Sequence, residues 1–187
     1  MSIQHLLENT HLYQSIQLKP SFGYCCLWCA LQGYDMSQPN KELMTKLPEL
    51  HGLAVLLDQN DQIEEVWYNK NLRYSLFFGK IICSQMIDQQ TEVWDLYQQY
   101  LFKQENSKQI WHYVITFYYR QNGNTSQCSI AIRKDDFNIS VFDPQSGMYT
   151  LIGLHLLQDW TKAFFKTYFE KPDLHKQIYK LRIFKVY

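Results

Sequence analysis

The chain has 187 residues, and its 18 Lys and Arg balance its 18 Asp and Glu, so the formal net charge is zero. A neutral chain has no overall charge to recruit nucleic acid or an anionic membrane, and we expect neither as a partner. The aromatic content of 16% argues against disorder and suits protein binding. We expect a single, monomeric domain over residues 1–187, with residues 1–18 as an N-terminal arm.

The five cysteines are an odd number, and three of them crowd into one short segment. Reduced thiols in a cytosolic compartment are the simplest interpretation. The first residues form neither a basic nor a continuous apolar region, so no signal peptide is expected. No apolar run approaches the roughly 20 residues of a membrane span, so a soluble protein is expected.

Periodicity and turn signals predict helices in the first half of the chain and mostly strands in the second. Helices are expected over residues 24–33 and 41–47, from Pro48 onward, from Thr91 onward and over residues 154–169. Strands are expected over residues 74–82, 110–120, 126–134, 137–142 and 177–186. Helices followed by an antiparallel sheet predict an α+β fold.

Two turns set the expected pairing of the strands. Asn122-Gly123 is a strong signal for a two-residue hairpin, which pairs Cys128 with Phe117. A second two-residue turn at Asp135-Asp136 pairs Cys128 with Asp143. Because directly opposed residues have Cβ atoms about 5 Å apart, these strands could present a base and its orienting carboxylate together.

Gly23-Tyr24-Cys25 opens a helix that is apolar almost all round, which indicates a buried central helix. A cysteine in the first turn of a helix has a lowered pKa and is a candidate nucleophile. The alternative is that this cysteine and its neighbours are small core residues, as most free cysteines are. Zinc requires further ligand pairs that the sequence lacks, so neither a metal nor another cofactor is expected.

Asp143 is the candidate orienting carboxylate, and an ordinary strand-ending turn at Asp143-Pro144 is the alternative interpretation. Gln17 could serve an oxyanion site, although a solvated glutamine is the commoner case. His112 is expected opposite Arg133 and on the other face from Cys128, which places it poorly as a base.

These segments resemble the YopT/AvrPphB family of papain-like bacterial effector cysteine proteases. The matching motifs are Gly23-Tyr24-Cys25, the strand SIAIR at residues 129–133, and Phe142-Asp143-Pro144 followed by Gly147. The family's catalytic histidine would fall on Cys128. A thiol with an ordinary pKa near 8.5 cannot replace an imidazole as general base at neutral pH.

The resemblance implies a papain-like cysteine protease fold, in which a helical lobe around the Cys25 helix packs on an antiparallel sheet. It implies catalytic positions at Cys25, Cys128 and Asp143, with a weaker oxyanion position at Gln17. The expected function is a degenerate protease that binds a host or partner protein after delivery from the bacterial cytoplasm by a secretion system, with a role in virulence. The alternatives are an active protease or acyl transferase using Cys25 with another base, and an α+β interaction domain without a site.

Overall fold

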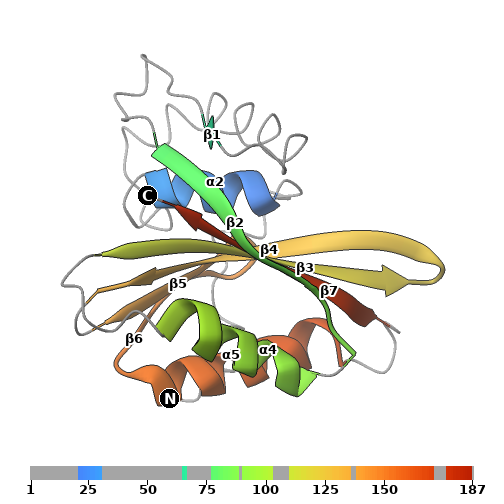
Figure 1. The fold of residues 1–187 in the computed structure, drawn as a ribbon. Coiled ribbons are helices and arrows are strands. Elements are labelled where there is room, and N and C mark those ends of the chain that lie inside the picture. The colour runs from blue at the N-terminus through green and yellow to red at the C-terminus, as the bar shows by residue number, and fades with distance from the viewer. Residues whose placement is uncertain are drawn as a thin grey trace.

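The computed structural model describes residues 21–30, 65–66, 77–88, 90–102, 110–135, 138–170 and 176–186. Most of these residues lie in strands and three helices (Figure 1). In chain order the elements are α2 (Ser21–Ala30), β1 (Glu65–Val66), β2 (Phe77–Met86), α4 (Gln90–Tyr97), the π-helical turn η2 (Gln98–Phe102), β3 (Trp111–Gln121), β4 (Asn124–Lys134), β5 (Ile139–Asp143), β6 (Gly147–Leu151), α5 (Leu154–Tyr168) and β7 (Gln177–Val186).

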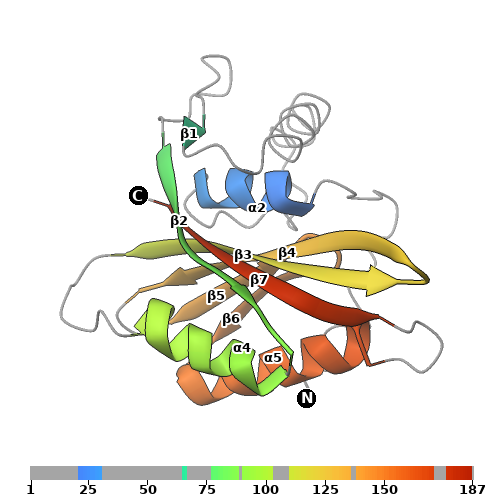
Figure 2. The same ribbon diagram turned by 45° about the vertical axis from the view of Figure 1, so that its right-hand side comes forward.

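The described strands form one antiparallel sheet in the order β1-β2-β7-β3-β4-β5-β6. The C-terminal strand β7 lies between β2 and β3, so the last described strand occupies the middle of the sheet (Figure 2). Its bounds, Gln177–Val186, are those predicted from the alternation of apolar and polar residues.

The β3–β4 hairpin has the predicted turn. Asn122 and Gly123 have φ angles of 52° and 80°, the left-handed conformations that a two-residue hairpin turn of this twist requires. The register predicted from this turn is confirmed, because Phe117 pairs with Cys128 and His112 pairs with Arg133.

One face of the sheet is covered by α4 and α5 (Figure 1). Phe117 on β3 contacts three phenylalanines near the C-terminal end of α5, with ring centroids 5.4–6.2 Å apart. Along α5 the buried residues recur at the spacing of one helical face and are Leu157, Trp160, Thr161, Phe164 and Phe165. This aromatic layer is the main core of the described structure.

The opposite face carries α2. Trp28 stacks on Phe142 of β5, with centroids 5.6 Å apart and planes 6° apart. Phe22 meets Phe184 of β7 edge to face at 5.8 Å. Both phenylalanines belong to the α2-side face, since the cross-strand pairs Phe142–Ala131, Ala131–Val114 and Val114–Phe184 run across the sheet.

The predicted papain-like α+β fold, with a helical lobe packed on a sheet, is wrong. The described structure is mostly an antiparallel sheet, and its helices lie on both faces instead of forming a lobe of their own (Figure 1). The physical reason is that both faces of the central strands are apolar. In β3, Tyr113, Ile115 and Phe117 are buried towards α5, while Val114 and Thr116 are buried towards α2.

Several predictions fall outside the described residues, namely the arm over 1–18, the helix over 41–47 and the helix from Pro48. The extent of the domain stays a prediction. Among the helices that the structure describes, none is both long and apolar enough to cross a bilayer.

Candidate functional site

The N-terminus of α2 is fixed to β4 at the point where β4 loses its other neighbour. The last β4–β5 pair is Ala131–Phe142. Two residues further along, the Ser129 N–H donates a hydrogen bond of 3.1 Å to Oγ of Ser21, and the Ser129 hydroxyl lies 2.9 Å from that of Thr116. The Ser21 hydroxyl thus accepts a hydrogen bond from a backbone N–H that β5 leaves unpaired. This bond sets the position of Cys25, which follows one helical turn later.

The helix begins earlier than predicted, at Ser21 instead of about Tyr24. The packing of Phe22 against Phe184 outweighs the helix-breaking tendency of Gly23, which is itself buried. Cys25 is consequently the fifth helical residue and not a residue of the first turn. Its N–H lies beyond the four free donors of a helix start, so the expected lowering of its pKa is largely lost.

The Cys25 side chain is completely buried. Burial raises the pKa of its thiol well above the ordinary value, and the neighbouring Cys29, Cys26, Asp143 and Cys128 raise it further. No charge or hydrogen bond that would lower this pKa is found in the described surroundings of the thiol. Cys25 is therefore a neutral thiol at physiological pH, because a buried anion without a partner is strongly disfavoured.

Cys128 lies on the other face of the sheet. It is paired with Phe117, whose ring contacts Phe164 and Phe165 of α5, and it packs against the core on that side. Burial raises the pKa of its thiol, Asp143 raises it further, and only Lys176 acts to lower it. The sheet thus separates Cys25 from Cys128, although the two are near enough to influence each other electrostatically.

The predicted pairing of Cys128 with Asp143 is wrong by two residues. Lys134 pairs with Ile139, so the connection spans four residues instead of two. The carboxylate of Asp135 accepts a hydrogen bond of 2.6 Å from the Asn138 N–H, and the Asp135 N–H donates to the Asn138 carbonyl at 3.1 Å. These two bonds hold the longer turn. A shift of two residues leaves every side chain on its predicted face.

Asp143 is a buried turn carboxylate. It accepts hydrogen bonds from the Gln145 N–H at 2.9 Å, from the Ser146 hydroxyl and from the Tyr168 hydroxyl at 3.0 Å. Its carbonyl also accepts the Ser146 N–H at 3.1 Å, which closes the turn. The alternative interpretation of Asp143 as a strand-ending residue therefore describes its contacts, and none of its donors is an imidazole. Burial raises its pKa despite these three donors.

His112 lies on the same side of the sheet as α2, and its ring meets Trp28 edge to face at 6.3 Å. Burial and the nearby Arg133 lower the pKa of His112 from 6.5 to about 4, so the imidazole is neutral at pH 7. Its Nε2 atom is buried and makes no hydrogen bond within the described part of the chain. The contact with Trp28 shows a histidine packed in the α2-side core.

The remaining predicted position, Gln17, lies outside the described residues. No group of three metal-ligating side chains occurs within the ranges that the structure describes. The structure therefore gathers Cys25, Cys128 and Asp143 around one short stretch of β4, but it places them on two faces and gives none of them a catalytic partner.

Sequence reasoning missed a second candidate site at the hairpin end of the α2-side face. The Tyr118 ring has the cationic groups of Lys180 and Arg182 at 5.2 Å from its centroid. Next to it, Arg120 lies 4.8 Å from the ring of Tyr179. The sequence alone predicts that Tyr118 and Arg120 share a face, because they are two residues apart in a strand. It does not predict the β7 residues beside them, because their contacts depend on the central position of β7 in the sheet.

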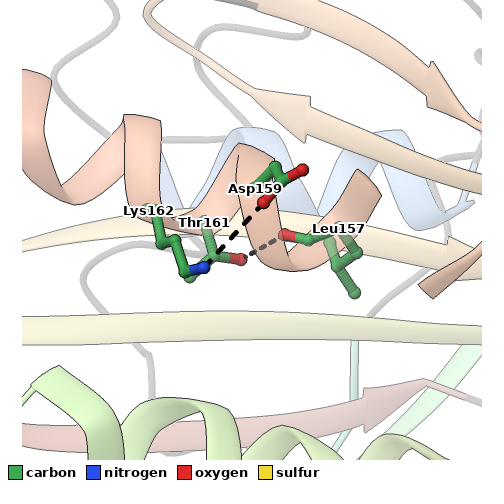
Figure 3. A network of polar contacts seen from close by, with 4 residues as sticks. All are labelled: Leu157, Asp159, Thr161 and Lys162. Carbon is green, nitrogen blue, oxygen red and sulfur yellow. Dashed lines mark hydrogen bonds and ion pairs between the residues drawn. The ribbon is translucent and has the colours of Figure 1, made fainter. Parts of the chain in front are cut away.

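A cavity of about 320 Å³ lies between α4 and α5 and is lined by Thr91, Trp94, Asp95, Gln158, Thr161 and Lys162. Figure 3 shows the polar contacts at its α5 wall. Thr161 donates to the Leu157 carbonyl at 2.8 Å, and Lys162 lies 3.9 Å from Asp159. Both contacts are internal to the helix, and the ion pair is exposed and weak. This wall supplies no catalytic arrangement.

Comparison with protein-family models, with curated proteins and with solved structures gives no match to this chain.

Proposed function

We propose that the chain is a protein-binding domain that performs no thiol chemistry. The absence of thiol chemistry is supported by the positions of the three predicted catalytic residues, which lie on two different sides of the sheet. Cys25 is a buried residue of α2 on one side of the sheet, while Cys128 and Asp143 face α5 on the other. A nucleophile requires a base within hydrogen-bond reach, and no described hydrogen bond joins Cys25 to a basic side chain.

The binding half of the proposal rests on the hairpin end of the α2-side face. Tyr118 and Tyr179 are half-buried there, Arg120 is exposed, and Met86 is 64% exposed on the neighbouring β2. Tyrosine, arginine and methionine are the residues enriched in protein interfaces. The three motifs that resemble effector proteases support a host protein as the class of partner to test first.

Site-specific photo-crosslinking tests the binding function. Benzoylphenylalanine is placed at Thr125, which is exposed on the hairpin opposite Arg120, and separately at Lys166, which is exposed on α5. In a host-cell extract we expect one discrete crosslinked protein from position 125 and none from position 166. Equal crosslinking from both positions, or none from position 125, contradicts the proposal.

Alkylation tests the absence of thiol chemistry. Cys25 is expected to react with iodoacetamide no faster than Cys26 and Cys29 in the folded protein, because all three are buried. All five thiols should react once the protein is unfolded in urea. Selective, rapid labelling of Cys25 in the folded state would restore the thiol-enzyme alternative.

A further inference from the structure

The two margins of the described sheet differ in how they end. At one margin the last strand is β1, which has two residues, and its neighbour β2 has an irregular register between Ile81 and Cys83. A very short edge strand and a bulge are two of the features by which proteins prevent unwanted pairing at a sheet edge. This margin is therefore protected against the addition of a further strand.

The other margin is β6, which lacks these features. All five of its residues, Gly147–Leu151, pair with β5 without a shift in register. No second strand pairs with β6 within the described part of the chain. It contains no proline and no charged residue, which are the other common means of protecting an edge strand. β6 is thus a regular, unprotected edge.

The uncharged stretch extends beyond β6, since residues 144–158 contain no Asp, Glu, Lys or Arg. Four large apolar side chains are exposed within the described ranges, and two of them directly follow β6, namely Ile152 at 71% and Leu154 at 38%. Thr150 is exposed as well, while Tyr149 is buried towards α5. The edge is therefore bordered by apolar surface that a partner strand would cover.

We infer that β6 pairs with β6 of a second copy of this chain, antiparallel and about a two-fold axis, so that the two sheets join into one. Antiparallel pairing of a strand with its own copy is self-complementary, because both strands offer the same donors and acceptors in opposite order. Thr150 is one residue from the centre of β6, so the two copies of Thr150 are near neighbours across the axis. This assembly differs from the monomer expected from the sequence, and it does not rest on the proposed function.

Two observations favour a second copy over a strand of another protein. Like charges that face each other destabilise a strand pair, and a second copy brings none, because residues 144–158 are uncharged and the whole chain has no net charge. Foreign peptides that add a strand are selected by pockets beside the sheet edge. The cavities of about 320 Å³ and about 190 Å³ have no β6 residue in their walls, so neither offers such a pocket.

Sedimentation velocity of the full chain tests the inference. A five-residue edge with two apolar neighbours gives a small interface, so we expect a reversible dimer with a dissociation constant on the order of 10 µM. Over a range of about 1 to about 200 µM, the protein should change from mostly monomer to mostly dimer.

Charge variants locate the interface. Thr150→Lys and Thr150→Glu should each weaken dimerisation by roughly tenfold or more, because the two introduced charges repel across the axis. An equimolar mixture of the two variants should dimerise about as well as the unmodified chain, because opposite charges now face each other. Ser84→Lys adds the same charge at an exposed position of β2 and should change the dissociation constant by less than about twofold.

Circular dichroism checks that each variant folds. If Thr150→Lys does not fold, Ile152→Lys and Ile152→Glu introduce the same charges just after the strand, where the side chain is 71% exposed. Three results overturn the inference. They are a chain that stays monomeric up to about 200 µM, a dimer that Ser84→Lys weakens as much as Thr150→Lys does, and a mixture of the Lys and Glu variants that does not dimerise.

Discussion

The Tyr168 hydroxyl donates a hydrogen bond of 3.0 Å to the carboxylate of Asp143 and so joins the last turn of α5 to the end of β5. This bond connects the helix that covers the sheet to the turn between its last two strands. Asp143 was expected to orient a catalytic base, and it instead links two parts of the core. The same geometry predicts which substitutions change stability.

Tyr168→Phe should lower the free energy of unfolding by about 1–3 kcal/mol, because it leaves a buried carboxylate with one donor fewer. Urea denaturation measures the change. Tyr149→Phe is the matched control, since its hydroxyl donates at 3.3 Å to the Ser146 carbonyl and not to a charge. The control should cost about 0.5–1.5 kcal/mol. A loss from Tyr168→Phe no larger than that of the control would show that Asp143 does not depend on this donor.

Asp143 should make the protein less stable as pH rises. Burial raises its pKa in the folded state, so the folded protein holds this proton more tightly than the unfolded chain. The resulting stabilisation is complete below the unfolded pKa of about 3.9 and is lost as pH rises through the folded pKa. Asp143→Asn cannot ionise and should remove this part of the pH dependence. Urea titrations of both proteins between about pH 3 and about pH 8 test it, and parallel curves would contradict the assignment.

The local parts of the fold were predictable from the sequence, because their signals lie within a few residues. Asn122-Gly123 specifies its hairpin turn, and apolar spacing specifies α5. The connection after β4 is longer than the predicted two-residue turn at Asp135-Asp136, because the bond from the Asn138 N–H to the Asp135 carboxylate extends it. That signal is also local and could have been found.

The site could not be predicted in the same way. Alternation along β4 places Cys128 and Ile130 on one face, but it does not say which face α2 covers. That choice depends on long-range packing of Trp28 on Phe142 and of Phe22 on Phe184. The contacts of Lys180 and Arg182 with Tyr118 need β7 between β2 and β3, and strand order is likewise a property of the whole sheet.

The effect of His112 on stability should have the opposite pH dependence to that of Asp143, because its contribution is lost as pH falls. Its pKa falls from 6.5 to about 4 on folding, so the unfolded chain binds this proton more readily. The contribution of a neutral His112 is complete above about pH 6.5 and is lost as pH falls towards about 4. His112→Phe keeps a ring against Trp28 and should flatten this part of the profile. Urea titrations of both proteins between about pH 4 and about pH 7 measure this profile, and parallel curves would contradict the assignment.

Cys128→His discriminates between the two interpretations of the thiols. If Cys128 held the position of a catalytic base, a histidine there would activate Cys25 and speed its alkylation. The structure instead places residue 128 beside Phe117 in the aromatic core under α5, on the far side of the sheet from Cys25. We therefore expect the free energy of unfolding to fall by about 1–3 kcal/mol, from overpacking and burial of a polar ring.

Iodoacetamide labelling of Cys25 in the Cys128→His variant, followed by mass spectrometry, should be as slow as in the unmodified protein. Cys128→Ala, which removes the thiol without adding an imidazole, is the control. Faster labelling of Cys25 in the histidine variant alone would show that the sheet does not separate the two positions.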